Sequence, residues 1–290
     1  MSVFPSAMPA GSPDYRLSDW AEFLRIAAAL DIGSPLRSAF VFRGQSRDWP
    51  LLPSLTRVAK KYEWTASQAL FVESRAVAHF RTSAHLYVPV SGIPKAWDYM
   101  GWWHLMQHFG APTRLLDWTD SPYVAAYFAA DTTNEEDDGV IWGVHGGLLG
   151  KAMRAQYPEG ASTAEGARRT GLYLNQDAPL ALHFVRARIQ AERMTAQQTA
   201  CSVSPQILGD HGSVVAGALE PELECYFKLI LPAEQKPTFL LRLRRMNMTA
   251  HALFPGVDGL GRSVRELVNM AGLQGPIEEP GIEPPEDSPN

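Results

Sequence analysis

One stretch of this sequence gathers polar side chains around two chain reversals. Gly110 can close a helix in the left-handed conformation, and Pro112 keeps that helix from resuming, so the chain must turn. Ser121 and Pro122 then give the start signal of a second, apolar helix. Polar residues that a core does not require, placed at loop ends beside a buried helix, are typical of a ligand site. In this stretch they are Gln107, His108, Thr113, Arg114, Asp117, Thr119 and Asp120.

A second chemical feature is an arginine at the end of an apolar strand. Residues 39–42 are rich in strand-forming side chains and lead directly into Arg43-Gly44-Gln45. A guanidinium held rigidly by a strand can bind a phosphate or carboxylate through two parallel hydrogen bonds. The alternative is an arginine in an ordinary surface salt bridge. The position at the strand end favours a ligand contact.

Carboxylates that could take part in chemistry occur in two places. Glu222 and Glu224 alternate along a predicted strand at 222–230, so both point to one face, where they are either a functional pair or two solvated side chains. Asp117 and Asp120 are further candidates, although Asp117 beside Arg114 could form a structural ion pair. Two groups of arginines are best explained as ordinary surface charge: Arg186, Arg188 and Arg193, and Arg242, Arg244 and Arg245.

The sequence contains little evidence for a metal site or a phosphate-binding loop. His104 and His108 lie one helical turn apart, but the segment lacks the glutamate that a zinc metalloprotease uses as its base, so we expect no metal. Gly150-Lys151 is followed by Ala152, which excludes a Walker loop. No G-x-G-x-x-G follows a strand, and no G-x-S-x-G elbow occurs.

The elements that position these residues predict an α+β fold with mixed or antiparallel sheets flanked by helices. Apolar periodicity predicts helices at 66–82, 97–109 and in the first part of 181–200, and a last helix ending near residue 270. Strands are expected at 139–145 and 238–243, besides those already named. Residues 155–180 are rich in Gly, Ser, Asn and Pro and predict an irregular insertion within about 146–180.

Composition bounds the class of protein. The chain has 290 residues, 46% hydrophobic and 20% charged, which is enough for one large domain at 15–272. The net charge of -5 equals the five carboxylates of the Pro/Glu-rich tail, so the body is neutral. Bulk charge therefore indicates neither nucleic acid nor a membrane surface, and it leaves a local basic face open. We expect a flexible N-terminus at 1–14 and a disordered acidic tail at 273–290. Two cysteines, Cys201 and Cys225, and no apolar leader predict a cytoplasmic protein.

Four motifs in this order resemble the FRG domain of bacterial proteins, which is named for its Phe-Arg-Gly motif. The first is Phe42-Arg43-Gly44-Gln45, and the second is Pro53-x-Leu55-x-Arg57. The third runs from Gln107-His108 to Asp117-Trp118-Thr119, and the fourth is Ala125-Ala126-Tyr127-Phe128-Ala129. The long third motif is specific. The resemblance is strongest over residues 36–130 and is faint again over 193–204 and 253–261.

A weaker similarity is to ADP-ribosyltransferases of the Arg-Ser-Glu class. It implies an ADP-ribosyltransferase-like fold, in which Arg43 binds the pyrophosphate or ribose of NAD while Thr119 and Ser121 orient the nicotinamide ribose. The third catalytic element maps by chain order onto Gln197 or Gln198, or else onto the carboxylates Glu222 and Glu224. The side chains expected to contact NAD are Arg43, Gly44, Gln45, Gln107, His108, Thr113, Arg114, Asp117 and Trp118.

The resemblances together imply a protein that binds NAD and either transfers ADP-ribose to a macromolecule or hydrolyses NAD. A toxin or phage-defence setting, with a neutralising antitoxin or another defence protein as partner, follows from the same similarity. The acceptor, protein or nucleic acid, is left open. The alternative is a non-catalytic regulatory module that binds a nucleotide or nucleic acid in the same cleft.

Overall fold

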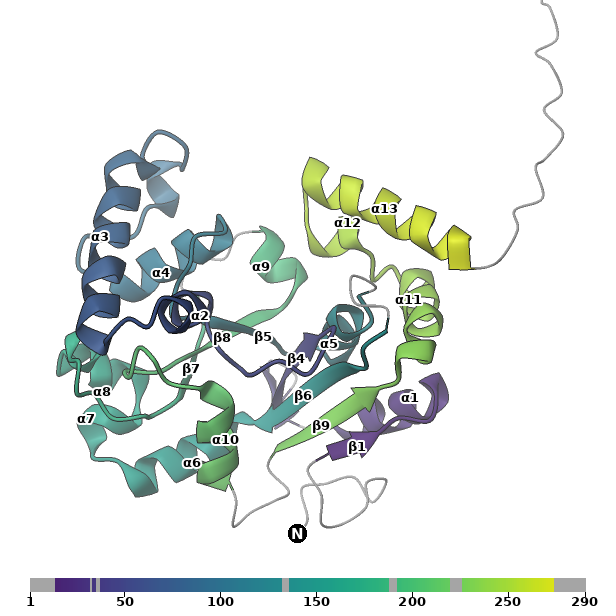
Figure 1. Ribbon diagram of the computed structural model, residues 1–290, viewed down its shortest axis with the longest axis horizontal. Coiled ribbons are helices and arrows are strands. Elements are labelled where there is room, and N and C mark those ends of the chain that lie inside the picture. The colour runs from purple at the N-terminus through teal and green to yellow at the C-terminus, as the bar shows by residue number, and fades with distance from the viewer. Residues whose placement is uncertain are drawn as a thin grey trace, which may run out of the picture.

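A mixed sheet flanked by helices organises the molecule (Figure 1). The computed structural model describes residues 14–31, 33–34, 37–131, 136–187, 192–219 and 226–273. Within these ranges, seven strands form one sheet in the order β1-β9-β6-β4-β5-β8-β7. Strand β1 runs parallel to β9, and the other neighbouring strands are antiparallel. The α+β class expected from the sequence is confirmed.

The strands are β1 (Asp14–Arg16), β4 (Phe40–Gln45), β5 (Leu116–Thr119), β6 (Gly139–His145), β7 (His183–Val185), β8 (Thr199–Val203) and β9 (Tyr226–Leu231), with a separate β2 (Gly33–Ser34) and β3 (Arg37–Ser38) pair. The helices are α1 (Trp20–Ala29), α2 (Ser54–Lys61), α3 (Ala66–Ala84), α4 (Tyr99–His108), α5 (Pro122–Ala129), α6 (Gly146–Gln156), α7 (Glu159–Ser162), α8 (Ala164–Arg169), α9 (Glu192–Ala196), α10 (His211–Leu219), α11 (Lys236–Arg245), α12 (Ala250–Leu253) and α13 (Val257–Leu273). Short 3-10 turns are η1 (Val90–Gly92), η3 (Leu172–Leu174) and η5 (Ala233–Gln235).

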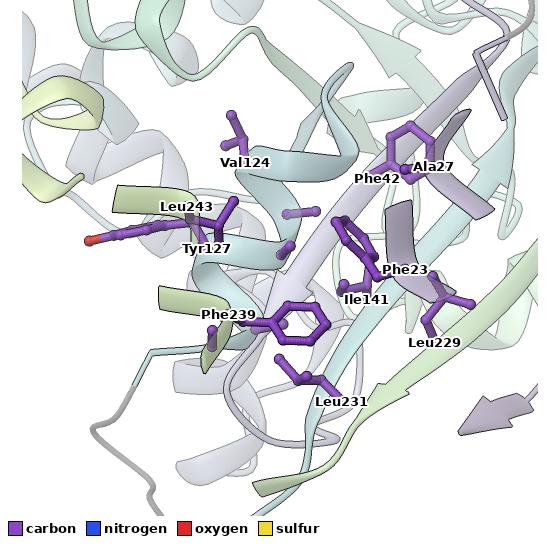
Figure 2. Close-up of a cluster of buried hydrophobic side chains, with 14 of the residues drawn as sticks. Phe23, Ala27, Phe42, Val124, Tyr127, Ile141, Leu229, Leu231, Phe239 and Leu243 are labelled. Atoms are coloured by element: carbon purple, nitrogen blue, oxygen red, sulfur yellow. The ribbon is translucent and has the colours of Figure 1, made fainter. Parts of the chain in front are cut away.

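Two hydrophobic cores cover the two faces of the sheet. On one face α1, α5 and α11 pack against β4, β6 and β9, and Figure 2 shows Phe23, Phe42 and Phe239 among the buried side chains there. On the other face Trp118 and Trp142 pack with residues of α6 and α10. The alternation of side chains along each strand therefore fills both faces, as expected for central strands.

Helix α5 lies unusually close to the sheet because glycine faces it. A Cβ added at Gly44 would lie 1.8 Å from the carbonyl oxygen of Ala125, and one added at Gly139 would lie 2.2 Å from that of Ala129. Only the missing side chains let the helix backbone approach β4 and β6 this closely. The glycine of the Phe-Arg-Gly motif thus has a packing role.

Strand β4 is fully paired on one side and almost unpaired on the other. It pairs with β6 over six residues, from Phe40 to Gln45, but with β5 only through Phe42 and Thr119. Continued pairing would match Gly44 with Asp117, and no such pair forms among the described residues. The sheet therefore opens between β4 and β5 immediately after Phe42.

Three local expectations were wrong. Residues 238–243 belong to helix α11, because Phe239, Leu240 and Leu243 are buried at helical spacing. The first part of 181–200 contains strand β7, which adds to the sheet edge beside β8, and the helix there is the later α9. Residues 155–180, expected to be irregular, hold α7, α8 and η3.

Several other expectations lie outside the described residues. They are the segment 1–13, the tail from residue 274 onward, and Glu222, Glu224 and Cys225. In the part of the chain that is described, no helix is long and apolar enough to cross a membrane.

Candidate functional site

A cavity of about 200 Å³ lies at the opening between β4 and β5, and we call it the Arg43 cavity. Strands β4, β5 and β8, helix α5 and the α9 segment all contribute to its wall. It brings together the strand-end arginine and the polar residues that precede α5, which are far apart in the sequence. The lining residues are Phe42, Arg43, Gly44, Asp117, Trp118, Thr119, Val124, Phe128, Arg193, Gln197 and Thr199.

Arg43 is held in place by the strand opening itself. Its Nη1 donates a 2.6 Å hydrogen bond to the carbonyl oxygen of Asp117, a group that lacks a β4 partner because the ladder has ended. Its Nε is buried and has no hydrogen-bond partner among the described residues. Burial lowers the pKa of Arg43, and the nearby Asp117 partly opposes this shift. A fixed guanidinium with a donor to spare is suited to bind an anionic ligand.

Thr119 lines the same cavity and is already partly engaged. Its hydroxyl donates to the carbonyl oxygen of Gln197 at 2.7 Å and accepts from the backbone N–H of Ser121 at 3.1 Å. A hydroxyl has two acceptor lone pairs, so one is left for a ligand. Gln197 also lines the cavity, while its Nε2 donates to the carbonyl oxygen of Leu253 at 2.9 Å.

Two residues expected at the site do not line the Arg43 cavity. The hydroxyl of Ser121 accepts from the backbone N–H of Val124 and caps helix α5. Gln198 adopts a positive φ of 49° and its carbonyl oxygen accepts from the backbone N–H of Asp120. Neither side chain lines the Arg43 cavity.

Asp117 provides the carboxylate of the cavity. Its side chain is exposed, and Oδ1 accepts a 2.6 Å hydrogen bond from Nε2 of Gln107. Gln107 in turn accepts through Oε1 from the hydroxyl of the buried Thr113. These two consecutive hydrogen bonds orient the carboxylate of Asp117. Among the described residues, Asp117 is the one carboxylate that lines the Arg43 cavity.

Arg114 is a structural residue and does not reach the cavity. It is 1% exposed, and its Nε donates to Oε1 of Glu73 at 2.8 Å. The guanidinium also stacks on the ring of Trp103, with 4.6 Å between its central carbon and the ring centroid. The suggested ion pair between Arg114 and Asp117 does not form: the partner of Arg114 is Glu73, on α3.

A second, narrow cavity of about 30 Å³ adjoins the first and shares Asp117, Arg193, Gln197 and Thr199 with it. Its other lining residues include His104, His108 and Cys201. Burial lowers the pKa of His104 to about 4 and also lowers the pKa of His108. Burial raises the pKa of the Cys201 thiol, which donates to Oδ1 of Asp117 at 3.5 Å. At neutral pH these groups are uncharged.

A third and larger cavity of about 620 Å³ continues from there, and we call it the apolar cavity. It shares His104, His108 and Met194 with the narrow one. Its wall is mainly apolar and is built by η1, α4 and the loop between them, with Ile93, Trp97, Leu105 and Phe109 among its residues. The three cavities thus follow one another from the strand opening to the outer face of α4.

Sequence reasoning missed Arg193 as a site residue. It lies on the short helix α9, lines two of the cavities and stacks on the ring of Phe254 at 4.6 Å. Burial lowers its pKa. The signal that could have found it is the faint FRG resemblance over 193–204. Arg186, in the same group of arginines, instead pairs with Asp120 across the sheet edge.

The structure thus brings together six of the predicted residues in the Arg43 cavity: Arg43, Gly44, Asp117, Trp118, Thr119 and Gln197. Gln107 and His108 line the adjoining narrow cavity. Gln45 and Thr113 are buried and line neither. The part of the chain that the structure describes holds no group of three or more His, Cys, Asp or Glu arranged to bind a metal ion.

Comparison with known proteins bears on residues 38–138, which match the family model described as FRG domain. This match includes the strand that carries Arg43 and the segment from Gln107 to Thr119, so it covers the elements that form most of the Arg43 cavity. Searches of curated proteins and of solved structures returned no match. Residues 38–138 of this chain are therefore an FRG domain.

Proposed function

We propose that this FRG domain binds NAD in the Arg43 cavity and cleaves its bond to nicotinamide, either transferring ADP-ribose to a macromolecule or hydrolysing NAD. One observation carries the proposal: Arg43 and Thr119, separate in sequence, open into one cavity that also contains a carboxylate, Asp117. The setting in a bacterial toxin or anti-phage system, in the cytoplasm, belongs to the same proposal and rests on the resemblance described above.

The charges of the cavity suit this ligand. Arg43 and Arg193 supply two guanidinium groups, which match the two phosphates of a dinucleotide. Breaking the bond between ribose and nicotinamide develops positive charge on the sugar, so a fixed carboxylate nearby stabilises the transition state more than the bound substrate. Asp117, oriented by Gln107, is placed for that role. Thr119 offers its spare lone pair to a ribose hydroxyl.

The size of the cavity also bears on the proposal. A volume of about 200 Å³ is below the usual range of ~300–1,000 Å³ for ligand pockets, so a dinucleotide must extend beyond the Arg43 cavity. The narrow cavity next to it shares Asp117 and Arg193 and leads away from the strand opening. We place the phosphates at the arginines, with the two ends of the dinucleotide on either side.

Calorimetric titration with NAD tests the proposal. Loss of charge-assisted hydrogen bonds of ~1.5–3 kcal/mol predicts that Arg43→Ala weakens binding by roughly 10- to 100-fold. Arg47→Ala is the matched control, since Arg47 is exposed, follows β4 and lines none of the cavities described above. Unchanged NAD affinity in a folded Arg43→Ala protein would refute the binding claim.

Catalysis is tested separately, by measuring release of nicotinamide chromatographically. Asp117→Asn keeps the size of the side chain and the hydrogen bond to Gln107 but removes the charge. We expect NAD binding to persist and nicotinamide release to fall by at least tenfold, in line with the loss of one transition-state contact of about 1.4 kcal/mol or more.

A second function, nucleotide binding without cleavage, is favoured by one observation. The glutamine at the position of the third catalytic element, Gln197, carries no charge and uses its amide to bind the carbonyl oxygen of Leu253. NAD binding without nicotinamide release in the wild-type protein, with and without cell extract, would support this alternative.

A further inference from the structure

The segment that builds most of the wall of the apolar cavity differs in charge from the rest of the chain. The whole sequence has a net charge of -5, whereas residues 73–116, which span most of α3, η1 and α4, have a net charge of +2. Glu73 and Arg114 neutralise each other in the interior. The remaining charged residues there are Arg75, Arg81 and Lys95 against the single carboxylate Asp98.

These three cations are exposed, and no ion pair involves any of them within the described residues. Lys95 lines the apolar cavity, and the guanidinium of Arg81 lies over the ring of Trp102 on α4 at 5.4 Å. Asp98 also lines the apolar cavity and caps α4 by accepting from the backbone N–H of Gly101, so its carboxylate offsets one of the three cations. The outward-facing charge of this surface is therefore positive.

Exposed aromatic rings accompany the cations. Trp97 is 53% exposed and Phe109 is 56% exposed, and both line the apolar cavity. Tyr87 and Tyr99, each one residue away from the lining, are 81% and 41% exposed. Large rings are normally buried, so a group of exposed ones at the mouth of a cavity indicates a binding surface.

Cations interleaved with exposed aromatic rings are the chemistry that binds single-stranded nucleic acid, in which phosphates contact the cations and bases stack on the rings. The cavity itself is suited to a base. Its volume of about 620 Å³ is of ligand-binding size, its wall is mostly apolar, and His104 and His108 add uncharged imidazoles. A peptide without acidic side chains would bury the same rings but gives no role to the positive charge.

We propose that the surface formed by α3, η1 and α4 binds single-stranded nucleic acid and inserts one base into the apolar cavity. The narrow cavity lies between the two larger ones: it shares His104, His108 and Met194 with the apolar cavity, and Asp117 and Arg193 with the Arg43 cavity. The inserted base therefore approaches the bound NAD through the narrow cavity. Nucleic acid is then the acceptor of ADP-ribose. The acceptor assignment rests on the proposed function, whereas the binding assignment does not.

The transfer step balances without any further reagent. A nitrogen or oxygen nucleophile of the base forms a bond to the anomeric carbon of the ribose, and the bond from that carbon to nicotinamide breaks. The bonding electron pair leaves with nicotinamide, which becomes neutral. The proton of the nucleophile passes to solvent or to the neutral imidazole of His108.

The binding claim is tested by fluorescence anisotropy with a labelled oligonucleotide of about 16 nucleotides, prepared as DNA and as RNA. We expect Trp97→Ala to weaken binding by roughly tenfold or more. Trp49→Ala, which removes a tryptophan that is 43% exposed and lies outside the apolar cavity, is the matched control and should have no effect. A tighter complex with one of the two oligonucleotides identifies the natural strand.

Salt dependence tests the role of the cations. Each lost phosphate contact should reduce the slope of log Kd against log salt by about 0.7. Arg81→Ala and Lys95→Ala should show this reduction, and Arg245→Ala, an exposed arginine on α11, should not. No binding at about 50 mM salt, or equal effects of the test and control variants, overturns the proposal.

Insertion of a base is tested by filling the cavity. Ala187→Trp adds a large ring to its wall, and Ala155→Trp adds the same ring to an exposed position of α6 outside it. We expect the first to weaken oligonucleotide binding and the second to leave it unchanged. Equal binding by both variants contradicts insertion.

The acceptor claim uses NAD labelled in its adenylate and the same oligonucleotide. The acceptor claim is supported if the wild-type protein and Ala155→Trp transfer the label to the oligonucleotide and Ala187→Trp does not. Nicotinamide release without label on the oligonucleotide overturns the acceptor assignment alone. Two results together overturn the proposed function but keep the binding assignment. The first is that neither the wild-type protein nor any variant turns over NAD, and the second is that Arg43→Ala still binds the oligonucleotide.

Discussion

The buried pair between Arg114 and Glu73 predicts a large stability effect from a small change. Arg114 is 1% exposed and Glu73 is 5% exposed, and the two are held by a two-pronged contact between the guanidinium and the carboxylate. Glu73→Gln keeps the volume of the side chain but leaves the guanidinium buried without a counter-charge. Its other contacts are the rings of Trp103 and Tyr173 and a 3.3 Å hydrogen bond to the carbonyl oxygen of Pro205. These do not replace a negative charge.

Breaking a buried ion pair by removing one partner costs about 3–5 kcal/mol. For a chain of this size each kcal/mol lowers the melting temperature by about 2–4 °C, so Glu73→Gln should lower it by roughly 6–20 °C. Urea unfolding gives the free energy directly. The control is Glu165→Gln, which removes the partner of Arg168 in an ion pair that is 35% and 58% exposed and should cost less than about 1 kcal/mol.

The double variant Glu73→Leu with Arg114→Met completes the test. It replaces both charges by apolar groups, so it should be more stable than Glu73→Gln alone. A free energy of unfolding for Glu73→Gln within about 1 kcal/mol of wild type would refute the assignment of this pair to the core. Since neither residue lines any of the three cavities described above, folded Arg114→Met should keep its affinity for NAD.

Three further outcomes follow from the structure. Gly44→Ala should unfold the domain or lower its melting temperature sharply, because the new Cβ would lie 1.8 Å from the carbonyl oxygen of Ala125; a normal melting curve contradicts the close packing of α5. Ser121→Ala should cost about 1 kcal/mol in urea unfolding, through loss of the α5 cap, and leave NAD affinity unchanged; weaker NAD binding would show that the hydroxyl contacts the ligand. Burial lowers the pKa of His104 to about 4, so the unfolded chain takes up this proton first and stability, full above about pH 6.5, falls as pH drops toward 4. This loss amounts to roughly 3 kcal/mol at about 1.4 kcal/mol per pKa unit, and His104→Phe should flatten that part of the curve of unfolding free energy against pH; an unchanged slope refutes it.

The sequence was sufficient where local chemistry dictates local structure. The left-handed Gly110, with φ of 81°, and the cap and first turn of α5 at Ser121 and Pro122 are as predicted. Strand β4 and helix α3 are also confirmed close to their expected bounds. Each depends on interactions between residues at most a few positions apart, so a short window contains the necessary information.

Local reasoning failed where distant contacts decide the outcome. Residues 238–243 can alternate as a strand, but packing of Phe239 and Leu243 against α1 and α5 makes them a helix. Arg114 has Asp117 three positions away, yet it binds Glu73, which is 41 positions away and is brought beside it when α3 packs against α4. Distance along the sequence does not predict which partner Arg114 binds, because the burial of both side chains determines the pairing.

The FRG-type motifs and the residue types of the site can be read from the amino-acid sequence alone. They are a strand-end arginine, a threonine before a capped helix, and a carboxylate in the same segment as that threonine. The contact between Arg43 and Asp117 depends on the folded arrangement, because it requires β4 and β5 to separate after a single pair. The folded arrangement also adds Arg193, which reaches the cavity from a helix that no local pattern connects to β4. A cavity forms between elements far apart in the chain, so its shape and its charge become defined only when the sheet has assembled.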